Sequence, residues 1–76
     1  MNLNEKQIEN VERMAVKVAK FMHPQISTQL IGAYDGQGGV IVFESGRSSS
    51  QPPLVTLKVI TIDGRICVTA AEPSTL

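Results

Sequence analysis

The stretch LVTLKVITIDGRICVTA, residues 54–70, decides the fold of this chain. It holds two runs rich in β-branched residues, separated by Asp63-Gly64. Asp-Gly between such runs is a strong signal of a β-hairpin, because a type I′ turn needs positive φ at both central residues. The stretch therefore predicts two antiparallel strands, at about 54–62 and 65–70.

This turn would fix the register of the hairpin, and alternation along each strand then assigns every side chain to one face. The pairs expected opposite each other are Ile62 with Arg65, Ile60 with Cys67, and Val59 with Val68. One face is expected to be apolar, with Val55, Leu57, Val59, Ile66, Val68 and Ala70. The other face mixes polar and apolar residues, namely Thr56, Lys58, Ile60, Ile62, Arg65, Cys67 and Thr69.

Two further strands are expected upstream of this hairpin, at about 26–34 and 40–45. DGQGG, residues 35–39, is a glycine-rich connection of hairpin length between them. The second of these strands begins with VIVF, residues 40–43, which is apolar at four successive positions. Both of its faces are therefore apolar.

The N-terminal part of the chain, residues 4–22, has a helical period instead. An apolar stripe recurs at spacings of three and four, formed by Ile8, Val11, Ala15, Val18 and Met22, and widened by Met14, Ala19 and Phe21. Asn2 with Glu5, or Asn4 with Gln7, would cap its start. Pro24 disfavours helical geometry at the preceding residue and so predicts the helix end.

These elements predict an α+β fold in which one N-terminal amphipathic helix packs on one face of a four-stranded antiparallel sheet. The simplest chain path is an α-β-β-β-β meander. We expect a single domain over residues 1–70 and a flexible C-terminal tail over 71–76.

The composition limits the ways in which so short a chain can be stabilised. It has 76 residues, and a domain of this size buries about 60% of the surface that its unfolded chain exposes. One cysteine cannot form an internal disulfide, and one histidine with one cysteine cannot build a structural zinc site. Neither a metal nor another cofactor is expected. Charged residues make up only 18% of the chain, so association with a partner is the favoured source of further stability.

Net charge and targeting signals bear on location and partners. Seven basic residues balance seven acidic ones, which gives no electrostatic reason for binding nucleic acid or an anionic membrane. No apolar run is long enough to span a bilayer, and the first ten residues do not resemble a signal peptide. A lone thiol and no export signal favour a cytoplasmic protein.

The second face of the sheet is the main candidate for a binding surface. One helix covers one face only, and an apolar second face needs a cover that the rest of the sequence does not supply. We expect another protein chain there or along an exposed edge strand, with a homodimer as the simplest case. The residues expected on this surface are Val40, Val42, Ile60, Ile62 and Cys67, with Tyr34 and Arg47 at its ends. The alternative is that loop residues half bury Val40 and Val42.

The polar loop SGRSSSQPP, residues 45–53, is a second candidate site. Arg47 and three serines could hold an anion, as phosphate-binding loops do. Such loops usually run into a helix N-terminus, whereas this one runs into Pro52-Pro53 and a strand. A plain connection between strands is the favoured interpretation.

Catalytic chemistry is not expected. His23 and Cys67 are the only candidates for a nucleophile and base, and no third group is evident to orient them. Asp35 and Asp63 both fall in turns, where carboxylates stabilise turn geometry.

The sequence therefore favours a small non-enzymatic protein-binding module, such as a regulator, inhibitor or assembly factor. Small inhibitors encoded by phages and mobile elements are similar to this chain in size and general class, and the analogy goes no further. One alternative is a nucleic-acid-associated protein that uses the basic helix residues Arg13, Lys17 and Lys20 with the Arg47 loop. The other is an anion-binding or ligand-binding domain at Gly46–Ser50.

Overall fold

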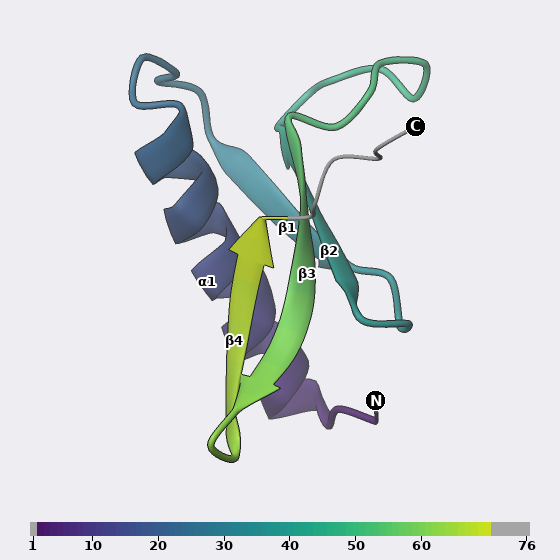
Figure 1. The fold of residues 1–76 in the computed structure, drawn as a ribbon. Coiled ribbons are helices and arrows are strands. Elements are labelled where there is room, and N and C mark those ends of the chain that lie inside the picture. The colour runs from purple at the N-terminus through teal and green to yellow at the C-terminus, as the bar shows by residue number, and fades with distance from the viewer. Residues whose placement is uncertain (1, 71–76) are drawn as a thin grey trace, which may run out of the picture.

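A computed structural model describes residues 2–70 as one helix followed by four strands. The helix is α1 (Glu5–Met22), and the strands are β1 (Leu30–Tyr34), β2 (Gly39–Glu44), β3 (Val55–Ile62) and β4 (Arg65–Ala70). The strands pair antiparallel in the order β1-β2-β3-β4, so the sheet is a meander. Figure 1 shows α1 lying against one face of this sheet. The predicted α+β fold is confirmed, while the predicted tail over 71–76 lies outside the described residues.

The ends of α1 follow from its capping residues. Asn4 is the N-cap, and its side chain accepts a hydrogen bond from the Gln7 N–H at 2.8 Å, while the Gln7 side chain accepts from the Asn4 N–H at 2.9 Å. This capping box satisfies two N–H groups at the helix start that have no intrahelical partner. At the other end, the His23 N–H donates to the Ala19 carbonyl, and Pro24 follows.

The start of β1 is later than the sequence predicted. Residues 26–29 were expected to be extended, but the strand begins at Leu30. The Ile26 N–H instead donates to the His23 carbonyl in a turn that follows the helix. The chain needs these residues to reverse direction before it can enter the sheet.

The β3–β4 hairpin forms as the sequence predicted. Asp63 and Gly64 have φ values of 51° and 77°, as a type I′ turn requires. The register confirms every pair expected from this turn: Ile62 with Arg65, Ile60 with Cys67, and Val59 with Val68.

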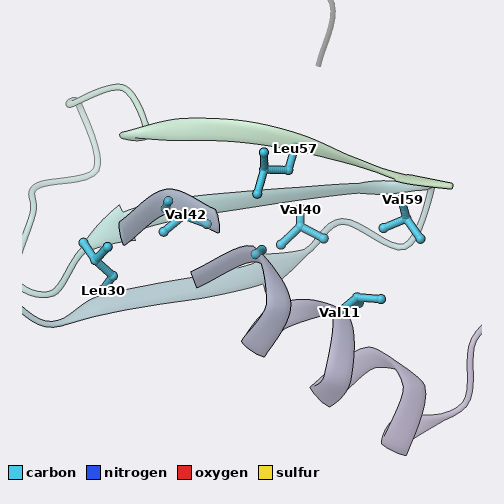
Figure 2. Packing of buried hydrophobic residues seen from close by; sticks show 8 residues of the cluster. Val11, Leu30, Val40, Val42, Leu57 and Val59 are labelled. Carbon is cyan, nitrogen blue, oxygen red and sulfur yellow. The ribbon is translucent and has the colours of Figure 1, made fainter. Parts of the chain in front are cut away.

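The core lies between α1 and the sheet (Figure 2). Its buried members are Val11, Ala15, Ala19, Leu30, Val40, Val42, Leu57 and Val59. The alanines let α1 approach the sheet closely, and Gly32 permits a close approach to β1. A Cβ added to Gly32 would lie 2.7 Å from the Glu12 carbonyl oxygen, too close for any side chain.

The last turn of α1 departs from the predicted apolar stripe. Phe21 was expected to widen the buried stripe, but its side chain is 88% exposed, and Met22 is 45% exposed. Val11, Ala15 and Ala19 form the buried centre of the helix instead. At 100° per residue, Phe21 points well away from this centre. Met14 lies on the same flank two turns earlier and is partly buried against the core, so only the end of this flank is exposed.

Candidate protein-binding face

The sheet face that points away from α1 is the candidate site, and we call it the open face. Alternation along the four strands assigns its side chains, because neighbouring residues in a strand point to opposite faces. Its residues are Ile31, Ala33, Gly39, Ile41, Phe43, Thr56, Lys58, Ile60, Ile62, Arg65, Cys67 and Thr69. None of them belongs to the hydrophobic core or to the partly buried side chains packed against it.

The prediction for β2 was wrong by one residue. Val40 and Val42, which the sequence analysis placed on the open face, are fully buried against α1. Their register explains this, because Val40 lies opposite Leu57 and Val42 lies opposite Val55, both on the helix-facing side of β3. A shift of one residue moves every side chain of a strand to the other face. The open-face residues of β2 are therefore Ile41 and Phe43.

Tyr34 is also on the other side from the one predicted. It pairs with Val40 and packs against the core, so it faces α1 and not the open face. Its hydroxyl oxygen is buried and has no hydrogen-bond partner among residues 2–70. The residue thus anchors β1 beneath the helix, near the start of the chain.

The first apolar cluster of the open face lies on β1 and β2. Ile31 is opposite Phe43, and Ala33 is opposite Ile41, so four apolar side chains form a compact group. Ile31 is 38% exposed, and the other three are half-buried by their neighbours. These four residues were not singled out from the sequence. Their signal was present in the two-sided apolar run VIVF, but the sequence did not decide which two residues faced outward.

The second apolar cluster lies near the turn of the β3–β4 hairpin and matches the prediction. Ile60 is opposite Cys67, both are half-buried, and Ile62 next to them is 53% exposed. Lys58 and Thr69, paired across the same two strands, are exposed and separate this cluster from the first. The open face therefore has two apolar areas with a polar strip between them.

Arg47 lies at the rim of the open face, as predicted. Its guanidinium carbon is 4.7 Å from the centroid of the Phe43 ring, within the range of a cation–π contact. The same guanidinium donates a hydrogen bond to the Gln51 carbonyl oxygen, four residues further along the same loop. Arg47 therefore borders the first apolar cluster through a contact with one of its members.

The charges of the open face are mainly positive. The strands present two charged side chains there, Lys58 and Arg65, and Arg47 adds a third cation at the rim. The Asp35 carboxylate adds a negative charge beside Gly39, because its Oδ2 lies 2.6 Å from where a Cβ of Gly39 would stand. Asp63 lies in the hairpin turn and not on a strand. Glu44 faces the helix side and accepts a hydrogen bond from the Thr28 hydroxyl at 3.1 Å.

The serine loop uses its polar groups internally. The Ser48 N–H donates to the Gln51 side chain at 3.1 Å, and the hydroxyl oxygens of Ser48 and Ser50 lie 3.0 Å apart. The hollow beside the loop measures about 520 Å³ and is lined by both Glu44 and Arg47. A carboxylate on its wall opposes anion binding, so the geometry gives this alternative little support.

The possible catalytic residues do not converge. His23 ends the helix on one side of the sheet, whereas Cys67 lies on the open face. Asp35 accepts hydrogen bonds from the N–H groups of Gln37 at 2.6 Å and Gly39 at 2.9 Å, and these bonds lower the pKa of its carboxyl below the usual value. This carboxylate therefore stabilises the β1–β2 turn.

The basic residues of α1 lie on a different side of the molecule from Arg47. Arg13, Lys17 and Lys20 are exposed on the helix, which covers one face of the sheet, while Arg47 contacts Phe43 on the other face. The two parts of the proposed nucleic-acid surface are thus separated by the sheet.

Within residues 2–70, no group of three or more histidine, cysteine, aspartate or glutamate side chains could hold a metal ion. The described helix, α1, is not apolar enough to cross a membrane. Comparisons of the chain with protein-family models, curated proteins and solved structures find no match.

Proposed function

We propose that this chain is a small non-enzymatic protein-binding module that docks another protein onto its open face. A regulator, an inhibitor or an assembly factor would each work in this way, and a cytoplasmic location belongs to the same proposal. The observation that carries it is the placement of two apolar clusters on the side of the sheet opposite α1. Apolar areas grouped on one surface and bordered by polar residues are typical of interaction sites.

The charges of the open face suggest the chemistry of the partner. Three cations, Lys58, Arg65 and Arg47, surround or divide the apolar clusters. One carboxylate, that of Asp35 beside Gly39, opposes them, so the positive charge is in excess. A partner surface with apolar side chains and neighbouring carboxylates would complement both properties, and such complementarity speeds association and selects partners. An acidic, partly apolar protein segment is therefore the occupant that we propose.

Two copies of this chain facing each other through their open faces fit less well. A two-fold axis through such an interface would bring the cations of one copy towards those of the other, with Lys58 in the polar strip near the centre. Like charges brought together in an interface cost free energy. The open face is thus better suited to a different protein than to itself.

Selection from a random peptide library, with the full chain immobilised, tests the proposal. We expect the selected peptides to combine apolar residues with Asp or Glu. Ile31→Lys and Ile62→Lys should each weaken binding of a selected peptide by about tenfold or more, because each places a charge in an apolar contact. Both side chains are more than one-third exposed, so both variants should fold.

The matched control is Phe21→Lys, which exchanges an equally apolar, 88% exposed side chain on α1 for the same charge. This variant should bind as the unmodified chain does. Loss of binding in Phe21→Lys, with binding retained in both sheet variants, would contradict the proposal. Tight binding of a single-stranded oligonucleotide with a steep salt dependence, and no peptide selected, would favour the nucleic-acid alternative instead.

A further inference from the structure

The two edges of the sheet differ in how well they are shielded. In a meander of order β1-β2-β3-β4, the edge strands are β1 and β4, and each has a row of N–H and C=O groups that point away from the sheet. Natural proteins cover such edges, interrupt them or place charges on them, because an uncovered edge can pair with another strand.

The edge of β1 is shielded by α1. Since the Asp35 N–H bonds to Gly39 in the β1–β2 pair, alternation directs the backbone groups of Leu30, Gly32 and Tyr34 outward. The outward N–H of Tyr34 donates to the Glu12 carboxylate at 2.9 Å. The helix backbone also lies so close to Gly32 that an added Cβ would be 2.7 Å from the Glu12 carbonyl oxygen. No extended chain can approach this edge without displacing the helix.

The edge of β4 has no such shield among residues 2–70. The two-residue turn makes Ile62–Arg65 a hydrogen-bonded pair, and alternation then directs the backbone groups of Ile66, Val68 and Ala70 outward. No side chain or backbone group of the described residues bonds to them.

The sequence of β4 also lacks the residues that protect an edge. The strand reads RICVTA, with no proline and no lysine, and its one charge, Arg65, is at the hairpin end. Ile66 and Val68 pack against the core but are only half-buried at this edge. A strand added beside β4 would cover the rest of both side chains.

We propose that β4 pairs antiparallel with β4 of a second copy of this chain. An antiparallel pairing of identical strands has a two-fold axis, so it is closed and self-complementary. Centred on Cys67, it would place Arg65 opposite Thr69 and Ile66 opposite Val68 of the other copy, so no like charges would face each other. The two sheets would form one continuous sheet, and the open faces of both copies would lie side by side. This inference does not depend on what binds the open face.

Sedimentation equilibrium on the full chain, over a range of concentrations, tests the pairing with two variants at one position. Val68→Pro removes an outward N–H but no bond to β3, and proline is tolerated at such edge positions. Val68→Ala also removes the isopropyl group, and takes away more apolar surface than proline does, but it keeps the N–H. We expect a dimer for the unmodified chain and for Val68→Ala, with a dissociation constant raised about tenfold or more in Val68→Pro. Circular dichroism checks that both variants fold.

Amide hydrogen exchange of the unmodified chain provides a test without substitution. The N–H groups of Ile66 and Val68 should be protected at high protein concentration and lose protection on dilution, whereas Cys67, bonded to β3, should stay protected throughout. A chain that remains monomeric at all concentrations would overturn the proposal. A dimer in which Ile66 and Val68 exchange freely, or one that Val68→Pro leaves intact, would also overturn it and would place self-association elsewhere.

Discussion

The guanidinium of Arg47 lies over the ring of Phe43, with its central carbon 4.7 Å from the ring centroid. This contact joins the long β2–β3 loop to the first apolar cluster of the open face. Hydrogen bonds from Arg47 and Ser48 to Gln51 are made within the same loop. At an exposed site such a contact stabilises by about 0.5–1 kcal/mol.

Replacing the ring tests this contact. In Phe43→Leu, we expect the side-chain protons of Arg47 to lose the upfield shift that an aromatic ring above them causes. The stability should fall by about 1 kcal/mol at most, because Phe43 is half-buried and leucine keeps most of the apolar area. Proton NMR provides the measurement. Unchanged Arg47 shifts would mean that the guanidinium does not stack on Phe43.

The opposite orientations of neighbouring residues in β2 lead to a second prediction. Val42→Ala should lower the free energy of unfolding by about 2 kcal/mol, since it deletes two buried methyl groups and leaves a cavity. Ile41→Ala should cost clearly less, although it removes more atoms, because Ile41 is half-exposed on the open face. Urea denaturation measures both. The reverse order would restore the original prediction that Val42 faces outward.

Gly32 gives a third prediction. Replacing it should change the stability in the direction opposite to that usual for a strand glycine. Replacing a strand glycine by alanine ordinarily stabilises, because glycine loses more backbone entropy on folding. Here Gly32→Ala should destabilise by about 1–3 kcal/mol, since the new Cβ would collide with the Glu12 carbonyl. Ala33→Ser, at the neighbouring position on the open face, is the control and should change stability by about 0.5 kcal/mol or less. A stabilised Gly32→Ala would show that α1 does not approach β1 this closely.

The Glu12 carboxylate provides a fourth prediction. Glu12→Ala should lower stability by about 1 kcal/mol, because the outward N–H of Tyr34 loses its acceptor. Glu12→Gln retains an acceptor oxygen and should recover most of this loss. The amide of Tyr34 should exchange faster with solvent in Glu12→Ala only, which hydrogen exchange measures. Equal exchange rates in the two variants would contradict the bond.

Asp35 provides a fifth prediction, about pH. Hydrogen bonds from Gln37 and Gly39 hold the pKa of its carboxyl below the ordinary value of 3.8. A carboxyl whose pKa is lower in the folded state stabilises the fold fully above pH 3.8, and this contribution is lost as the pH falls through the folded-state pKa. The stability difference between the unmodified chain and Asp35→Asn should therefore shrink on acidification below that pH. A difference that is constant or grows would contradict this assignment.

Local signals in the sequence predicted most of the fold. Asp63-Gly64 fixed the last hairpin, because a two-residue turn determines which residues are opposite each other. The period of α1 and its capping residues predicted the helix to within a residue. Ile60, Ile62 and Cys67 were assigned to the correct face for the same reason, since their register follows from that turn.

The sequence did not show in the same way which side chains of β2 face α1 and which face outward. VIVF is apolar on both sides, and neither the glycine-rich turn nor the long serine loop fixes a register by its length. Pairing with Leu57 and Val55 decides it, and that is a tertiary interaction. Tyr34 was assigned to the wrong face for the same reason, because it pairs with Val40. The close approach at Gly32 depends on how α1 crosses β1, which is also a tertiary interaction.

Mapping a bound peptide onto the chain by amide chemical shifts tests the central claim most directly. We predict that a selected acidic, apolar peptide perturbs the open face, above all Ile31, Ile41, Phe43, Ile60 and Cys67. The amides of the exposed side of α1, such as Glu9, Arg13 and Lys17, should stay unchanged. Perturbations centred on α1 or on the serine loop, with the open face unaffected, would contradict the claim that this chain binds its partner through the open face.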